Sequence, residues 1–313
     1  MIYKYYGCSG LTSLNLSDCL NLPSVTVNRN RYDGIFYGVS RNTLIYLPGG
    51  KGHSDGGGKN VIIGNKCTGG FALQEGQSFE SPVGFEADEV SYDRTFTSGV
   101  TSTVCLPYTI AASNVLGGKF YSFGGVSDDF VVTMNEVTGD IQASTPYLFV
   151  PSSESIGFDG SVTVGIVNRD TSPLTKNGEW DFCGTYEKIT WRTAEDFGDA
   201  VIYGFAANTY GEHVQAGDFV KVSPSNDSYI NPFRAYLKFT AQQGGPGSRA
   251  VSKRVLPNKL KVVLVDSDDS TTAIRNVATD GRHDAWFSLD GKRLESMPTQ
   301  KGVYVRNGKK IVK

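Results

Sequence analysis

The chain has 313 residues, of which 39% are hydrophobic, and its 30 basic and 32 acidic side chains leave a net charge of −2. That balance gives no global field to attract polyanions, so nucleic acid is excluded as an expected partner. No stretch approaches the roughly 20 apolar residues that cross a bilayer, so membrane insertion is not expected either. The 37 Gly, 16 Tyr and 17 Phe favour a mainly β protein with many tight turns.

The first elements along the chain are two copies of one pattern. Residues 5–17 (YYGCSGLTSLNLS) align without a gap on residues 36–48 (FYGVSRNTLIYLP), 31 positions further on. Apolar residues occupy alternate positions in each copy, which predicts two short strands with inward-facing side chains, Leu14 and Leu16 in the first and Ile45 and Leu47 in the second.

A single repeat of this size cannot fold alone, because it buries its apolar face only against neighbouring units. The segment LPSVTVN (residues 22–28) has the spacing of a strand on the other side of the unit. We expect the strands in residues 60–71 to lie directly against the repeat sheet and close its apolar edge. The intervening GGKGHSDGGGKN (residues 49–60) departs from the phosphate-binding loop pattern and is predicted to be a flexible connection.

The unit YGCSGLTSLNLS resembles the repeats of bacterial surface leucine-rich-repeat proteins, over residues 1 to about 66. The resemblance implies that residues 1–66 are the end of a repeat array and its cap. It also implies further repeats and an export signal upstream of the given sequence, and a location outside the cell or on its outer surface.

Five cysteines without a CxxC pair argue against a structural zinc site and a dense disulfide framework. Most are expected to be buried free thiols. A disulfide bridge between Cys8 and Cys19 is possible but not required.

From Phe71 to about Thr240 the chain has short segments rich in aromatic and β-branched residues, separated by turn signals such as Asn177-Gly178. This pattern is typical of a β-sandwich or barrel. Proline lacks the N–H that a strand ladder needs, so Pro146 is expected at a strand edge or start. TAEDFGDA (residues 193–200) has the composition of a single helical turn.

The phrases TVCLPYTI, ASTPYLFVP, GDFVKVS and INPFRAYLKF resemble a recurring module of secreted proteins of Bacteroidales bacteria. The resemblance implies a β-sandwich-like, exported module that is not an established enzyme.

Residues 241–254 have the composition of a linker, and KLKVVLVD after them predicts a strong strand. Asp290-Gly291 and Asn307-Gly308 predict hairpin turns in a small terminal β unit. This tail resembles C-terminal sorting segments of the same exported proteins. The predicted organisation is therefore a repeat remnant and cap (1–66), a β-sandwich-like region (67–243), and a linker with a β tail (244–313).

Candidate site residues are few. The three tryptophans could stack on sugar rings or belong to the core. Three aspartates that follow Val265, where the KLKVVLVD strand is expected to end, are weak candidates for ligands of a hard cation and could equally be turn residues. Four acidic residues near two of the tryptophans form the best cluster in the sequence for glycan hydrolysis. The alternative is that they form a solvated rim around the β-sandwich core. These residues are Trp180, Trp191 and Trp286, then Asp266, Asp268 and Asp269, and finally Glu179, Glu187, Glu195 and Asp196.

No nucleophile elbow, metalloprotease helix motif or Cys/His signature occurs in the chain. The sequence therefore predicts a monomeric, non-enzymatic interaction protein without a cofactor or a firm metal site, whose partner is a surface protein or glycan. One alternative is a carbohydrate-binding module that uses exposed aromatic residues. A second is a glycan-active enzyme.

Overall fold

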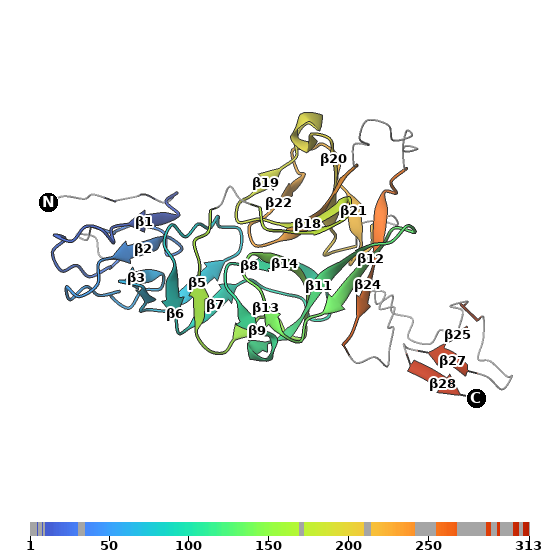
Figure 1. Cartoon of the computed structure of the whole chain (residues 1–313), viewed down its shortest axis with the longest axis horizontal. Coiled ribbons are helices and arrows are strands. Elements are labelled where there is room, and N and C mark those ends of the chain that lie inside the picture. The colour runs from blue at the N-terminus through green and yellow to red at the C-terminus, as the bar shows by residue number, and fades with distance from the viewer. Residues whose placement is uncertain are drawn as a thin grey trace.

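A computed structural model of the chain (Figure 1) describes residues 5, 8, 10–30, 35–168, 172–209, 214–241 and 255–267, and the backbone of four short strands after residue 285. The fold is mainly β, as the sequence predicts. Within these ranges the helical elements are two 3-10 turns, η1 (Ala112–Asn114) and η2 (Ala194–Phe197). The second is the single helical turn expected from TAEDFGDA.

The N-terminal part is one sheet of six strands that begins as a parallel ladder. Its strands, in spatial order, are β1 (Ser13–Asn15), β2 (Leu44–Leu47), β3 (Val61–Ile63), β4 (Lys66–Cys67), β6 (Phe85–Ala87) and β16 (Val162–Val164). β1 pairs with β2 and β2 with β3, both in parallel. Figure 1 shows this ladder at the N-terminal end of the molecule.

The register of the ladder follows the sequence repeat. Leu14 pairs with Ile45, an offset of 31 residues and the same as the offset that aligns the two copies. Ile45 and Leu47 are fully buried, and Leu14 packs against their cluster. The segment LPSVTVN, expected to form a strand, makes only an isolated parallel bridge between Thr26 and Ser54. The segment after residue 60 adjoins the repeat strands as predicted, because β3 continues their sheet.

The central part packs a layer of aromatic side chains between the N-terminal sheet and the next one. β5 (Phe71–Gln74) and β7 (Val90–Asp93) pair in parallel beside it. Two small antiparallel pairs flank this core: β9 (Ile110–Ala111) with β13 (Asp140–Ile141), and β10 (Val115–Leu116) with β15 (Gly157–Phe158). The cluster includes the rings of Phe71, Phe79, Phe85, Tyr108 and Phe233.

The largest element is a sheet of ten strands. In spatial order they are β17 (Leu174–Asn177), β18 (Trp180–Gly184), β23 (Ala235–Thr240), β20 (Ala200–Phe205), β21 (Phe219–Lys221), β24 (Lys259–Val265), β12 (Val131–Glu136), β11 (Gly118–Val126), β14 (Thr145–Pro151) and β8 (Ser102–Leu106). The sheet curls, since its first strands β17 and β18 contact β11 and β14. The curl encloses a second core.

Successive side chains along a strand point to opposite faces of the sheet, so one strand contributes to two different cores. On β14, Tyr147 and Phe149 belong to the central aromatic core, whereas Leu148 lies inside the curl. Tyr236 on β23 points to a third, smaller core that also contains Trp191. That core lies beside η2 and the short pair β19 (Ile189–Thr190) and β22 (Tyr229–Ile230).

Local turn predictions agree with the pairings. Asn177 pairs with Trp180 across the β17–β18 hairpin, and Gly178 has the positive φ of 64° that such a tight turn requires. Pro146 is the second residue of β14, before the point where β14 begins to pair with β11. It therefore costs the sheet no ladder bond on that side.

The pairings cross both predicted domain boundaries. The N-terminal sheet runs past residue 66 to β6 and β16. β24, which the boundary at residue 244 assigns to the tail, lies between β21 and β12 in the ten-stranded sheet.

A separate four-stranded sheet follows, in the order β26 (Arg293–Leu294), β25 (Trp286–Ser288), β27 (Val303–Arg306) and β28 (Lys309–Val312). Arg306 pairs with Lys309, which agrees with a hairpin at Asn307-Gly308. All of the predicted linker (241–254) after residue 241, and the two turn dipeptides, lie outside the described residues. In the described part of the chain, no helix has the length and apolarity to span a membrane.

Candidate functional site

Two of the three candidate tryptophans are core residues. Trp180 is 4% exposed and packs on Tyr203 and Phe239, with ring centroids 5.7 and 4.9 Å away. Trp191 is 5% exposed, and its ring centroid lies 5.1 Å from that of Tyr236. At these exposures neither offers an open ring face to a sugar, so their interpretation as stacking platforms is wrong, although Trp191 is among the residues that line the cavity described below. The side chain of Trp286 lies outside the described residues.

The acidic candidates do not gather into a site. Asp266 accepts a hydrogen bond from the Tyr121 hydroxyl at 2.7 Å, and Asp268 and Asp269 lie outside the described residues. Throughout the described ranges, no three His, Cys, Asp or Glu side chains are arranged to hold a metal ion.

Of the carboxylates predicted near the tryptophans, Asp196 has a local structural role. Asp196 accepts the backbone N–H of Thr193 at 2.8 Å and of Arg192 at 2.6 Å, at the start of η2. These two bonds lower the pKa of its carboxyl group. Glu195 is exposed on the same turn.

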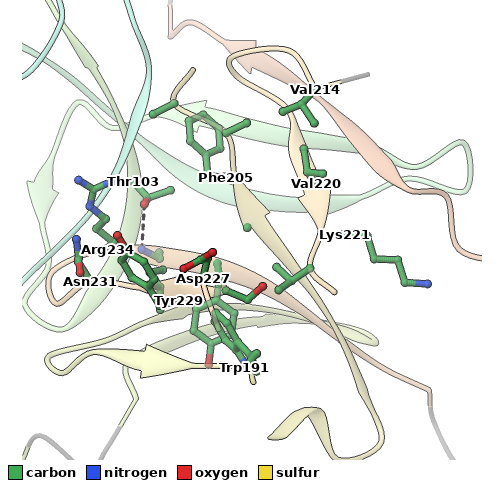
Figure 2. A pocket seen from close by; sticks show the side chains of 18 of the residues that line it. Thr103, Trp191, Phe205, Val214, Val220, Lys221, Asp227, Tyr229, Asn231 and Arg234 are labelled. Carbon is green, nitrogen blue, oxygen red and sulfur yellow. Dashed lines mark hydrogen bonds between the residues drawn. The ribbon is translucent and has the colours of Figure 1, made fainter. Parts of the chain in front are cut away.

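A cavity of about 770 Å³ lies among β20, β21, β22 and β23. We call it the Arg234 cavity. Figure 2 shows its two sides: Tyr229, Asn231 and Arg234 gather on one, and Phe205 and Val220 lie on the other. Arg94 and Thr103 also line it. The cavity therefore has a polar side with two arginines and a largely apolar side that also includes Lys221.

Strand pairing brings the charged residues beside this cavity together. Glu75 follows β5 and Arg94 follows β7, and these strands are parallel, so both residues emerge at the same edge. A backbone bond from Glu75 N–H to the Asp93 carbonyl (3.2 Å) extends the pairing to that point. Arg234 precedes β23, and its carbonyl accepts the Thr185 N–H at 3.1 Å.

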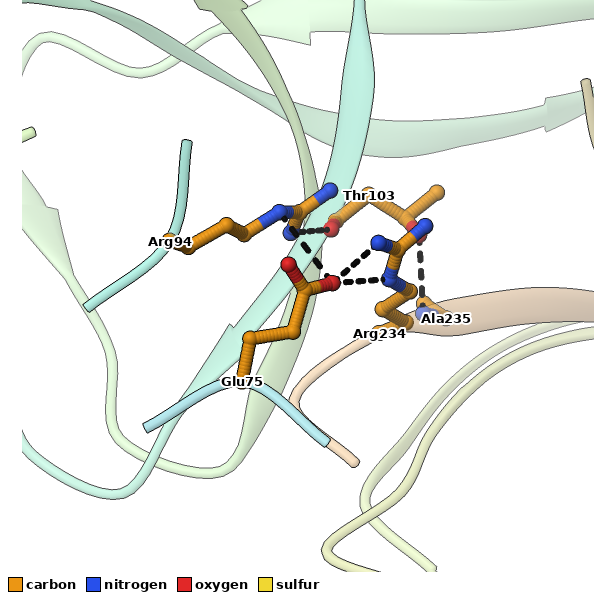
Figure 3. Close-up of polar contacts among 5 residues, drawn as sticks. All are labelled: Glu75, Arg94, Thr103, Arg234 and Ala235. Atoms are coloured by element: carbon orange, nitrogen blue, oxygen red, sulfur yellow. Dashed lines mark hydrogen bonds and ion pairs between the residues drawn. The ribbon is translucent and has the colours of Figure 1, made fainter. Parts of the chain in front are cut away.

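Glu75 is shared by the two arginines (Figure 3). Arg234 donates through Nε to Glu75 Oε1 at 2.6 Å, and its Nη2 contacts the same oxygen. Arg94 Nε lies 3.5 Å from that oxygen, while its Nη1 donates to the Thr103 carbonyl at 2.8 Å. The Arg94 guanidinium also lies 4.6 Å from the centroid of the Phe96 ring. We call Glu75, Arg94 and Arg234 the arginine cluster.

The three members of the arginine cluster differ in how far they are buried, and Arg94 is the most buried. The side chains of Arg94, Glu75 and Arg234 are 3%, 21% and 31% exposed. One carboxylate thus faces two guanidinium groups, which leaves one excess positive charge in a partly desolvated place. Burial lowers the pKa of Arg94, and the charge of Arg234 lowers it further.

Arg234 lines the cavity and has a donor nitrogen to spare. Its Nε and Nη2 bond Glu75, and no partner for its third nitrogen, Nη1, is found among the described residues. A guanidinium fork matches the planar geometry of a carboxylate or phosphate. The cavity wall can therefore accept an anionic group.

A second cavity, also of about 770 Å³, lies between the repeat unit and β5–β7. A half-buried cation in its lining, Arg29, donates to the carbonyls of Thr43 (2.9 Å) and Lys59 (3.1 Å). Burial lowers the pKa of Arg29 to about 10. This arginine holds backbone segments of the repeat together, so the second cavity is the weaker candidate.

The exposed aromatic residue beside the Arg234 cavity is Tyr229, which is 50% exposed. The Lys188 ammonium lies 3.9 Å from its ring centroid. Sequence reasoning chose tryptophans for their size and missed this residue. The sequence does indicate that Tyr229 is exposed, because the polar and turn-forming residues of SNDSYINPF surround it instead of an apolar strand pattern.

Comparison with protein-family models, curated proteins and solved structures found no match to this chain.

Proposed function

We propose that this chain is a non-enzymatic binding protein that works outside the cell or on its outer surface, and that the Arg234 cavity holds an anionic group of its ligand. The observation that carries the proposal is the sharing of one carboxylate, Glu75, by two arginines beside a cavity. An anion placed at Arg234 Nη1 would offset the excess positive charge.

The surface location and the absence of catalysis rest on the sequence resemblance to exported Bacteroidales modules. The absence of catalytic motifs in the sequence is consistent with a binding role. A protein or glycan partner and a monomeric state are part of the same proposal.

A thermal unfolding experiment tests the anion site. The full chain, an Arg234→Gln variant and a Lys261→Gln variant are melted in sodium phosphate and in sodium chloride of equal ionic strength. Lys261 is an exposed β24 residue outside the cavity, so its substitution removes one positive charge without touching the site. The quantity compared is the gain in melting temperature from phosphate, which separates binding from any loss of stability in the variants.

We expect phosphate to stabilise the parent chain and the Lys261→Gln variant more than the Arg234→Gln variant. A concentration ten times the dissociation constant adds about 1.4 kcal/mol to the free energy of unfolding. An equal gain in all three proteins would overturn the proposal, because phosphate would then act without the cavity.

A further inference from the structure

The lining of the Arg234 cavity is amphiphilic in the way that a sugar ring is. Phe205, Val214 and Val220 form one side, and Asp227, Asn231 and Arg234 lie on the other. A pyranose ring has apolar C–H faces and an edge of hydroxyl groups. Its shape therefore suits a space between an apolar wall and polar side chains.

The polar side is held in place by its own loop. Between β21 and β22, Ser225 Oγ accepts the Asp227 N–H at 3.2 Å, and Ser228 Oγ donates to the Ser223 carbonyl at 2.7 Å. The backbone of Trp191 brackets the same loop, donating to the Ser228 carbonyl (2.8 Å) and accepting the Ser225 N–H (3.1 Å). The loop thus presents the exposed Asp227 at the cavity with little freedom to be lost on binding.

Asp227 and Asn231 provide complementary groups for hydroxyls. A carboxylate accepts hydrogen bonds from sugar hydroxyls, and a side-chain amide both donates and accepts. The two line the same cavity as Arg234, whose Nη1 lacks a partner in the described part of the chain. Groups that bind hydroxyls and a group that binds a carboxylate therefore line the same cavity.

Tyr229 adds a ring face. It lines the same cavity, is half exposed, and follows directly on Ser228 at the end of the fixed loop. An exposed tyrosine ring gives contact area with little loss of side-chain freedom. Cavities on the order of 300 to 1,000 Å³ enclose ligands of drug size, so a short oligosaccharide has room here.

Resting on the proposed function, we infer that the ligand is a glycan containing a uronic acid. Its carboxylate binds Arg234, its hydroxyls bind Asp227 and Asn231, and its ring lies against Tyr229. An acidic peptide could satisfy Arg234, but it would leave the carboxylate of Asp227 facing a second carboxylate with few hydroxyl donors nearby. The combination of a cation, a carboxylate and an amide favours the acidic sugar.

The test is calorimetric titration of the full chain with three defined probes: trigalacturonate, a trisaccharide of mannuronate, and a hyaluronan tetrasaccharide. The methyl ester of whichever probe binds has the same ring and linkage but no charge. Tetraglutamate and acetate provide carboxylates without a sugar.

We expect at least one oligouronide to bind more tightly than acetate and tetraglutamate. Esterification of that probe, or Arg234→Gln in the protein, should weaken binding roughly 10- to 100-fold, as loss of a charge-assisted hydrogen bond does. Tyr229→Ala should also weaken it, whereas Tyr229→Phe, which keeps the ring, and Lys261→Gln should not.

Two outcomes would overturn this inference. One is that none of the three oligouronides binds more tightly than acetate, and the other is that tetraglutamate binds as tightly as the best of them. In either case a phosphate effect that depends on Arg234 would leave the anion site itself standing, so the two proposals fail separately.

Discussion

Replacing Glu75 with glutamine tests the electrostatics of the arginine cluster directly. Glutamine keeps the shape and one acceptor oxygen of the side chain but removes the charge that faces both guanidinium groups. Breaking a fully buried ion pair costs about 3–5 kcal/mol. Arg234 is 31% exposed and water screens it, whereas Arg94 is only 3% exposed and carries most of the penalty. We therefore expect Glu75→Gln to lower the free energy of unfolding by about 3 kcal/mol.

Urea denaturation of four proteins measures this effect: the parent chain, Glu75→Gln, Arg94→Met and the double variant. Because removal of Glu75 leaves Arg94 charged and buried, removal of both should cost less than the sum of the single losses, with a coupling energy of at least about 1 kcal/mol. A loss below about 1 kcal/mol for Glu75→Gln, or strictly additive losses, would refute the view that Glu75 is needed to neutralise a buried cation.

Two further predictions concern packing and thiol chemistry. A Cβ on Gly184 would lie 2.6 Å from the Cys105 sulfur, so Gly184→Ala should lower the free energy of unfolding in urea by about 1–3 kcal/mol. The control is Gly204→Ala, which should be tolerated because the nearest atom to its Cβ would lie at 3.5 Å. Equal stability of the two variants would contradict this packing. Burial raises the pKa of three thiols to between about 11 and 12, so they stay protonated at pH 8. Iodoacetamide should therefore label only the two exposed cysteines of the native chain, which peptide mass spectrometry can show. Rapid labelling of any buried cysteine would contradict its environment. The exposed pair is Cys8 and Cys19, and the protected set is Cys67, Cys105 and Cys183.

The parts of the fold that local pattern encodes were predictable. The 31-residue offset of the two copies gave the pairing of Leu14 with Ile45, because a parallel ladder aligns equivalent positions of successive repeats. The β17–β18 hairpin followed from Asn177-Gly178, since a tight turn needs a residue that tolerates positive φ. Both signals lie within or between neighbouring segments.

The candidate site was not predictable, because its charged residues come from three distant segments. Glu75, Arg94 and Arg234 each look like an ordinary charged residue after or before a strand. Only the parallel pairing of β5 with β7 and the approach of β23 bring them together. The prediction for Trp180 and Trp191 was wrong because side-chain size has two uses. A large ring can serve as a stacking platform, but here the size of Trp180 fills the core inside the curled sheet.

The position of β24 also bears on the order in which the chain can fold during synthesis. This strand is the last of the ten to leave the ribosome, yet it sits between β12 and β21, which have no other partner on those sides of the sheet. Until residue 265 has been translated, the nascent chain holds two open strand edges, and open edges are templates for pairing with other chains. The ten-stranded sheet becomes continuous only when β24 inserts, so a nascent chain that has already formed β12 and β21 is exposed to wrong strand pairing until then.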